Sequence, residues 1–166
     1  YCADGGMISA WSEPGGSTLF RLVLPTIEEQ ELARRRLLYV EDDEAVRPAT
    51  AALLEHYDWS VTQVVDATAA IAILRSDAES YAALLTDLEL PGGGESIATT
   101  AREVHPELPI VFTSACTGRL AEVAAKVSGA QAVPKPASAD DLVQALEAAC
   151  ADPLGAGRRE RRLRRA

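Results

Sequence analysis

Ala-Ala-Leu-Leu-Thr-Asp-Leu-Glu-Leu-Pro, residues 82 to 91, is the stretch from which the organisation of the chain can be worked out. Its apolar residues lead to Asp87, and Pro91 and three glycines follow soon after. A short apolar run with such an abrupt end is typical of a strand buried on both faces. The loops at the carboxyl ends of parallel strands form the ligand crevice of an open sheet, so we expect Asp87 at a site rather than in the core.

A carboxylate at such a position can act as a nucleophile, as a metal ligand or simply as a turn-forming residue. A second apolar run, residues 37 to 40, leads to Glu41, Asp42 and Asp43 at the same predicted edge of the sheet. Crowded carboxylates repel one another unless a cation lies among them, and oxygen ligands suit Mg²⁺. Capping is the alternative for Asp43, because carboxylates also stabilise a helix N-terminus.

Two further strand ends carry polar side chains. The apolar residues 110 to 113 end at Ser114, and residues 130 to 133 lead to Lys135, whose bond to the following proline is a candidate for the cis form. An acid pair, a central acid, a hydroxyl and a lysine, each at the end of its own strand, favour transfer of a phosphoryl group onto Asp87. Mg²⁺ and the lysine would offset the negative charge.

Four stretches in this order, Leu-Leu-Tyr-Val-Glu-Asp-Asp, Leu-Leu-Thr-Asp-Leu-Glu-Leu-Pro, Val-Phe-Thr-Ser-Ala and Val-Pro-Lys-Pro, resemble the receiver domain of response regulators in two-component signalling. The resemblance implies an α/β, flavodoxin-like fold: a doubly wound, five-stranded parallel sheet in the order 2-1-3-4-5. It implies that Asp87 is the phosphoacceptor, Ser114 the switch hydroxyl and Lys135 the lysine that pairs with the phosphoryl oxygens. The implied Mg²⁺ ligands are Asp42, Asp87, Glu41 and the backbone carbonyl of Glu89.

Helix and strand patterns alternate along the chain, as a parallel sheet wound on both faces requires. Besides the runs already named, residues 61–65 fit a strand. A helix after Asp43 is expected to bury Val46, Ala49, Leu53 and Leu54, and further helices are expected at residues 67–74, 97–104 and 120–127. Ser138 is predicted to cap the last helix, which Asp140 and Asp141 begin.

Three features depart from the family pattern. The loop with glycines 92–94 is short, and its composition predicts mobility. Ala137 stands where an aromatic residue often follows Lys-Pro. Ala132 stands where many receivers carry a tyrosine or phenylalanine that swings inward on phosphorylation, so the usual relay to an output surface is not expected.

Composition fits one ordinary domain with attachments: the chain has 166 residues, of which 48% are hydrophobic. The three cysteines include no Cys-x-x-Cys pair, so the sequence predicts neither a disulfide framework nor a zinc site, and a reducing cytoplasmic location fits. No apolar stretch is long enough for a membrane span. The chain opens at Tyr1 without a methionine, which leaves upstream segments, and membrane attachment through them, open.

Charge is distributed unevenly. Residues 158–166 carry six arginines against Glu160, a sum of +5, which leaves −14 on the remainder of a chain whose net charge is −9. Such an acidic body is a poor direct ligand for nucleic acid, because a phosphate backbone must be met by lysine or arginine.

The N-terminal residues lie outside the receiver pattern. Residues 1–26 contain two strand-like segments and resemble the closing segment of the ATP-binding domain of sensor histidine kinases, although the upstream nucleotide-binding boxes are absent from the chain. A plain hairpin is the alternative. We expect a helical linker at residues 27–36, the receiver domain at 37–150, and a disordered basic tail at 151–166.

Our first interpretation is therefore the receiver domain of a hybrid histidine kinase, without a complete catalytic domain in this chain. Its expected partner is a histidine kinase or a histidine phosphotransfer domain, which supplies the phosphoryl group. The alternatives are a stand-alone receiver that acts as a protein-binding module and a phosphohydrolase that forms an aspartyl-phosphate.

Overall fold

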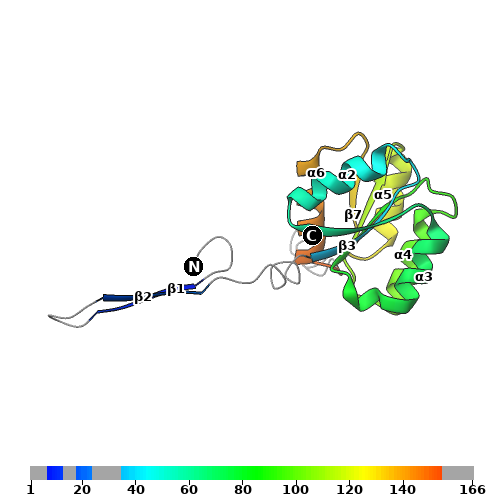
Figure 1. Cartoon of the computed structure of the whole chain (residues 1–166). Helices are drawn as coiled ribbons and strands as arrows, with labels where there is room; N and C mark the ends of the chain where they lie inside the picture. The colour runs from blue at the N-terminus through cyan, green and yellow to red at the C-terminus, as the bar shows by residue number, and fades with distance from the viewer. Residues whose placement is uncertain (1–6, 13–17, 24–34, 155–166) are drawn as a thin grey trace, which may run out of the picture. The chain divides into compact units, whose positions relative to one another are not determined.

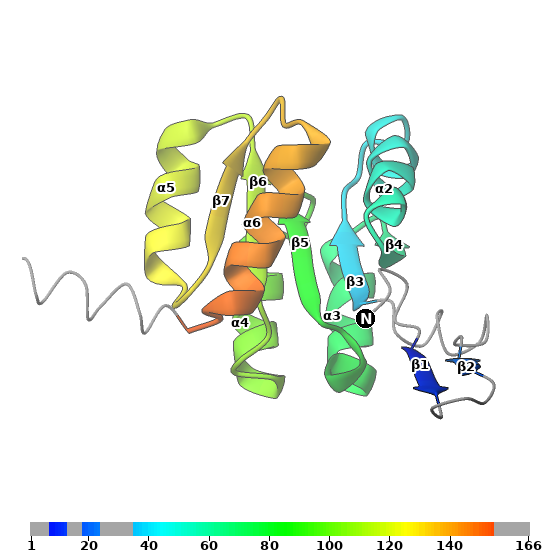
Figure 2. The ribbon, with the colours of Figure 1, turned by 90° about the vertical axis from the view of Figure 1, so that its left-hand side faces the viewer.

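Figure 1 shows the computed structural model of the whole chain. Strand β5 (Ala83–Asp87), the run that ends at the predicted phosphoacceptor, is the middle strand of its five-stranded sheet (Figure 2). All of its residues are buried. The strand order is β4-β3-β5-β6-β7, and neighbouring strands pair in parallel, which confirms the predicted order 2-1-3-4-5. The other four strands are β3 (Arg35–Val40), β4 (Trp59–Val64), β6 (Ile110–Ser114) and β7 (Gln131–Pro134).

The structure describes residues 7–12, 18–23 and 35–154. The chain divides into two compact units, Tyr1–Arg34 and Arg35–Ala166, and each is considered by itself. In the described part of the first unit, β1 (Met7–Ser12) pairs antiparallel with β2 (Thr18–Val23), which confirms the expected two-stranded extension. Residues 27–34 of the predicted linker and residues 155–166 of the predicted tail lie outside the described residues. The tail was predicted to begin at residue 151, but Ala151 still belongs to the last helix, Ala139–Ala151.

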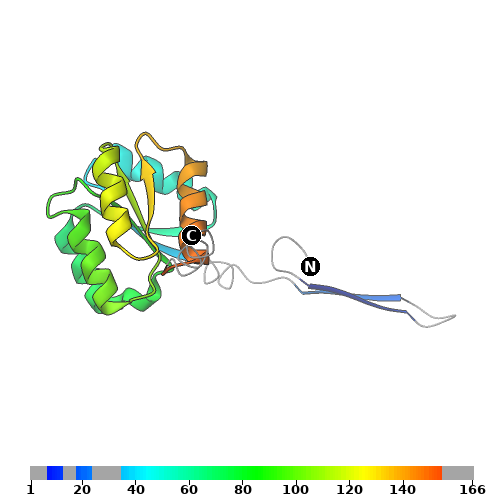
Figure 3. The ribbon, with the colours of Figure 1, turned by 180° about the vertical axis from the view of Figure 1, so that it is seen from behind.

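Helices cover both faces of the sheet. One face packs α2 and α6, and the other packs α3, α4 and α5 (Figures 2 and 3), so each face has its own apolar core cluster. The helices are α2 (Val46–His56), α3 (Ala67–Asp77), α4 (Gly94–Val104), α5 (Thr117–Lys126) and α6 (Ala139–Ala151), with a short 3₁₀ turn η1 (Ala78–Ser80). No helix in the described ranges is long and apolar enough to cross a membrane.

Helix α6 starts as the sequence predicts. The Ser138 hydroxyl accepts the backbone N–H of Asp141, and the Asp141 carboxylate accepts the backbone N–H of Ser138, which together form a capping box. The helix then buries Leu142, Leu146 and Ala149 against the sheet.

The predicted buried face of helix α2 is wrong in part. Of the four apolar residues assigned to it, only Leu54 is buried, whereas Leu53 is 51% exposed and Val46 is 40% exposed. The inner face instead combines Ala51 and Leu54 with the partly buried Arg47, four and seven residues earlier at helical spacing. A long arginine stem can lie along apolar surface while its guanidinium finds polar partners, so the apolar pattern alone misplaces this face.

The linker predicted at residues 27–36 extends two residues too far, because strand β3 already begins at Arg35. Arg35 and Arg36 form the start of strand β3, and their guanidinium groups lie over the rings of Trp59 and Tyr81, at 4.3 and 4.7 Å from the ring centroids. Cation–π stacking and strand pairing with β4 therefore hold these two arginines, which the sequence prediction placed in the helical linker.

Candidate functional site

The alternation of side chains along the strands brings three of the predicted site residues to one face. Tyr39 in β3, Leu85 in β5 and Val133 in β7 belong to the core cluster beneath α2 and α6. Successive residues of a strand point to opposite faces, so the positions two residues farther on, Glu41, Asp87 and Lys135, follow the same face at the carboxyl edge of the sheet.

Three carboxylates meet at this edge. Glu41, Asp42 and Asp87 each offer an oxygen atom, and these atoms all lie within 4.8 Å of one another. Glu41 is 2% exposed and Asp87 is 5% exposed, whereas Asp42 lies on the surface. A cluster of oxygen donors with one solvent-accessible member matches the preference of Mg²⁺ for carboxylates and water.

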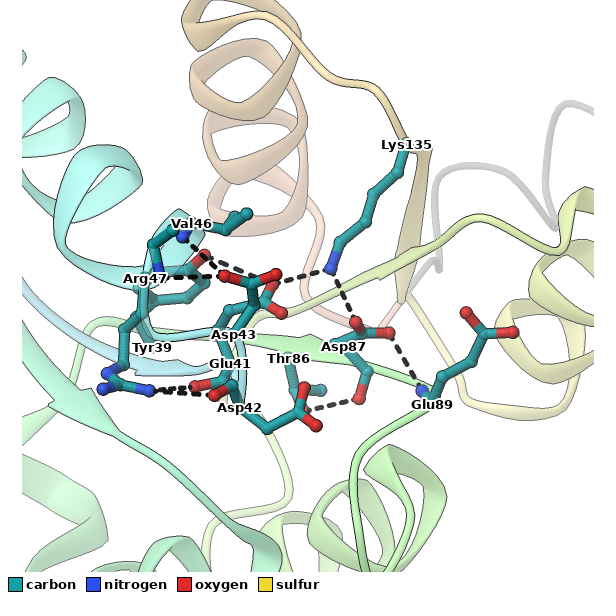
Figure 4. A network of polar contacts seen from close by, with 11 residues as sticks. Tyr39, Glu41, Asp42, Asp43, Val46, Arg47, Thr86, Asp87, Glu89 and Lys135 are labelled. Carbon is teal, nitrogen blue, oxygen red and sulfur yellow. Dashed lines mark hydrogen bonds and ion pairs between the residues drawn. The ribbon is translucent and has the colours of Figure 1, made fainter.

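The Lys135 ammonium bridges the two buried acids. Its Nζ atom is 2.6 Å from Oδ2 of Asp87 and 2.7 Å from Oε2 of Glu41 (Figure 4). Burial by itself lowers the pKa of this ammonium, but the hydrogen bonds and negative charges of Asp87 and Glu41 outweigh burial and raise the pKa above its ordinary value. Lys135 is therefore charged at neutral pH. The peptide bond between Lys135 and Pro136 is cis, as predicted.

Tyr39 is a site residue that the sequence interpretation did not include. Its hydroxyl donates to Oε2 of Glu41 at 3.4 Å, so this carboxylate oxygen contacts both a phenol and an ammonium. Burial, together with the nearby Glu41 carboxylate, raises the pKa of Tyr39 to about 12 although a hydrogen bond with Thr50 and the charge of Lys135 oppose the shift. Its position two residues before Glu41 on one strand is the signal that could have identified it.

The acidic loop after β3 is held by helix α2. Nη1 of Arg47 donates to the carbonyl oxygens of Glu41 and Asp42 at 2.9 and 3.4 Å. Oδ1 of Asp43 accepts the backbone N–H groups of Ala45 and Val46 at 2.8 and 3.0 Å, and these bonds lower the pKa of its carboxyl group. Asp43 therefore caps the turn into the helix. The role of Arg47 could not be predicted from residue spacing, because it depends on a tertiary contact with backbone carbonyl oxygens.

The glycine loop after Pro91 fixes the backbone of Asp87. Gly92 and Gly93 have φ of 88° and 77°, which is the left-handed region that favours glycine. Gly94, the first residue of α4, packs so closely that a Cβ atom there would overlap with the carbonyl oxygen of Asp87. Oδ1 of Asp87 accepts the backbone N–H of Glu89 at 2.9 Å, so the loop also orients the carboxylate, while metal binding by the Glu89 carbonyl stays a prediction.

Ser114 and Thr113 end strand β6 beside Asp87 and face opposite sides of the sheet. Ser114 is fully buried, and its hydroxyl oxygen accepts the backbone N–H of Cys116 at 2.9 Å. No hydrogen bond between Ser114 and Asp87 is present in the described part of the chain, so the switch role of Ser114 stays a prediction.

Comparison of the sequence with family models, and of the structure with solved structures, identifies proteins that are similar to this chain. The family model for the response regulator receiver domain matches residues 37–147. A response regulator receiver protein from Sinorhizobium medicae WSM419 is 25% identical, with a TM-score of 0.66 over 72% of this chain and 97% of that chain. The receiver domain from the hybrid histidine kinase CckA is 27% identical, with a TM-score of 0.58 over 68% of this chain and 95% of that chain. No curated protein matches the sequence.

We expect Gly94→Ala to lower the free energy of unfolding by about 1–3 kcal/mol, because the added methyl group must displace the Asp87 carbonyl or the first turn of α4. Gly118→Ala is the matched control: this position in α5 has open space around it, and alanine is favoured over glycine in a helix by about 1 kcal/mol. Urea unfolding of both variants measures the difference. Equal stabilities would show that the contact between Gly94 and Asp87 is unimportant.

Proposed function

The chain belongs to the response regulator receiver domain family of two-component signalling, and on this basis we propose that Asp87 accepts a phosphoryl group from a phosphohistidine. The observation that carries the proposal is the environment of this carboxylate. Asp87 is buried, its Oδ2 atom lies 2.6 Å from the Lys135 ammonium, and two further carboxylates lie within 4.8 Å. A carboxylate that only forms a turn does not require burial beside an ammonium and two further carboxylates.

In the proposed reaction a carboxylate oxygen of Asp87 attacks the phosphorus atom. The oxygen–phosphorus bond forms while the phosphorus–nitrogen bond of the phosphohistidine breaks, and the electron pair of that bond stays on the imidazole nitrogen. Lys135 already contacts Asp87, so its ammonium is placed to follow the negative charge onto the phosphoryl oxygens. Ser114 would then turn its hydroxyl toward the same oxygens.

Glu41, Asp42 and Asp87, with the backbone carbonyl of Glu89, would hold the Mg²⁺ ion. When bound, Mg²⁺ offsets the charge that develops on the phosphoryl oxygens. The carboxylates themselves fit this ion, since they supply several oxygen donors and only one neighbouring ammonium, Lys135, contacts the buried pair in the described residues.

Incubation with a small phosphodonor such as phosphoramidate should add one acid-labile phosphoryl group to the chain in the presence of Mg²⁺, as intact mass measures. Asp87→Asn should remove the label, because an amide oxygen is a poor nucleophile. Labelling of Asp87→Asn to the same extent would overturn the assignment. Steady release of inorganic phosphate, with the phosphoryl label turning over instead of accumulating, would favour the phosphohydrolase alternative.

Substitution of Asp42 tests the proposed metal site, and substitution of the neighbouring Asp43 is the matched control. Asp42→Ala should weaken Mg²⁺-dependent labelling at least tenfold and leave the free energy of unfolding nearly unchanged, because Asp42 is exposed. Asp43→Ala should retain labelling, and it should lower the free energy of unfolding because two backbone N–H groups lose their acceptor. Equal loss of labelling in the two variants would mean that both acids act at the metal.

We propose a hybrid histidine kinase as the parent protein, with a kinase or histidine phosphotransfer domain as the phosphodonor and the cytoplasm as the location. The support is the likeness to the CckA receiver domain, together with an antiparallel pair of strands where the sequence resembles the end of a kinase ATP-binding domain. The acidic body argues against nucleic acid as the direct partner.

The chain by itself should neither bind nor hydrolyse ATP, because the described residues before position 35 supply only two strands of the proposed ATP-binding domain. Titration with a fluorescent ATP analogue and a phosphate-release assay on the purified chain can measure this. ATP hydrolysis that persists in the purified chain would contradict the kinase-fragment interpretation, while the receiver assignment would be unaffected.

A further inference from the structure

The carboxylate of Glu41 has two hydrogen-bond donors, and both contact the same oxygen atom. Nζ of Lys135 lies 2.7 Å from Oε2, and the hydroxyl of Tyr39 lies 3.4 Å from it (Figure 4). The first contact is short and charge-assisted, whereas the second is longer than the roughly 2.5–3.0 Å usual for a hydroxyl donor. Lys135 therefore supplies most of the compensation for Glu41, and Tyr39 contributes little in this arrangement.

Phosphoryl transfer would take part of this compensation away. In the proposed reaction the Lys135 ammonium, which also contacts Asp87, follows the negative charge onto the phosphoryl oxygens. These oxygens lie beyond the carboxylate to which the phosphorus is bonded, so the contact between Lys135 and Glu41 weakens. Glu41 is 2% exposed, so water cannot readily replace the ammonium. A buried carboxylate that loses its donor is costly, and Oε2 of Glu41 then needs another one.

The Tyr39 hydroxyl is placed to replace the ammonium. Tyr39 is 2% exposed and belongs to the core cluster beneath α2 and α6, so packing fixes the position of its ring. Its hydroxyl also hydrogen-bonds to the side chain of Thr50 in α2. A carboxylate can only accept, so the Tyr39 proton points to Glu41 while the Tyr39 oxygen accepts the proton of Thr50. A small rotation of the Glu41 side chain can therefore shorten a contact that already exists.

We propose that Tyr39 is a positioning residue for phosphoryl transfer: its hydroxyl holds Oε2 of Glu41 when Lys135 moves to the phosphoryl oxygens, so this carboxylate stays in the acidic cluster. The inference rests on the proposed function. It requires the hydroxyl to matter more after the lysine has moved than before. A hydroxyl that only stabilises the folded core would contribute equally in both situations.

Tyr39→Phe keeps the ring and removes the hydroxyl, and beryllofluoride is a stable mimic of the phosphoryl group on an aspartate. Calorimetric titration of the full chain measures the affinity for Mg²⁺ alone and then the affinity for beryllofluoride at saturating Mg²⁺. In Tyr39→Phe we expect the Mg²⁺ affinity to change less than threefold. The beryllofluoride affinity should fall about tenfold, as is usual when one hydrogen bond to a charged group is lost.

Tyr81→Phe is the matched control for the loss of a buried phenol hydroxyl. Tyr81 is 6% exposed, and its hydroxyl contacts Thr62 and Arg36 rather than a residue of the proposed site. Its substitution should leave the affinities for Mg²⁺ and for beryllofluoride unchanged. Circular dichroism will show that each variant is folded.

A second measurement needs no phosphoryl chemistry. Lys135→Met removes the ammonium permanently, so among the described residues the Tyr39 hydroxyl is then the remaining side-chain donor to Glu41. Without Mg²⁺, Tyr39→Phe should lower the melting temperature by at least about 3 °C more in the Lys135→Met background than in wild type.

The outcomes separate this inference from the proposed function. If wild-type protein does not bind beryllofluoride, the proposed function fails and the inference fails with it. If wild type binds but Tyr39→Phe loses Mg²⁺ and beryllofluoride affinity equally, the inference alone is wrong. A loss of the same size in Tyr81→Phe would show that the effect is not specific to the hydroxyl beside Glu41. Equal losses of melting temperature in the two backgrounds would contradict the claim that Tyr39 can replace Lys135.

Discussion

Repulsion among the carboxylates of Glu41, Asp42 and Asp87 is the constraint on which the rest of the site depends. At 4.8 Å and an effective dielectric constant of about 20, two such charges repel by about 3 kcal/mol. Glu41 and Asp87 are buried, so water screens them little, and the Lys135 ammonium compensates both. Their arrangement leaves a local excess of negative charge, which is the electrostatic basis for attracting a metal ion and then a phosphoryl group.

The fold holds this unfavourable cluster in place through contacts that are mostly made by the backbone. Strand β5 is central and buried, so the position of Asp87 is set by pairing with β3 and β6. Arg47 binds two carbonyl oxygens of the acidic loop, and Gly94 allows α4 to approach the Asp87 carbonyl. These contacts limit how far the carboxylates can separate, so a bound cation relieves their repulsion more readily than movement of the chain.

The sequence predicted the features that follow from periodicity and strand ends. The buried strand that ends at Asp87 and the cap of the last helix at Ser138 have short-range signals, whereas the order of the sheet was implied by the resemblance to receivers, and all three are confirmed. The inner face of α2 and the start of β3 were misplaced because arginines there make tertiary contacts: Arg47 reaches carbonyl oxygens, and Arg35 stacks on Trp59. The Lys135 bridge to Glu41 joins residues 94 positions apart, and the unpaired hydroxyl of Thr113 depends on what surrounds it. Neither has a local pattern.

The most direct test of this electrostatic account is the thermal stability of wild type and Lys135→Met, measured with and without Mg²⁺. Methionine keeps much of the apolar stem and removes the charge, so without Mg²⁺ the variant should lose on the order of 2 kcal/mol, less than the 3–5 kcal/mol typical of a fully buried pair because Lys135 is 28% exposed. Addition of Mg²⁺ should raise the melting temperature of Lys135→Met more than that of wild type, since the ion then supplies the only strong compensating charge. An equal or smaller shift in the variant would contradict the claim that lysine and metal relieve the same repulsion.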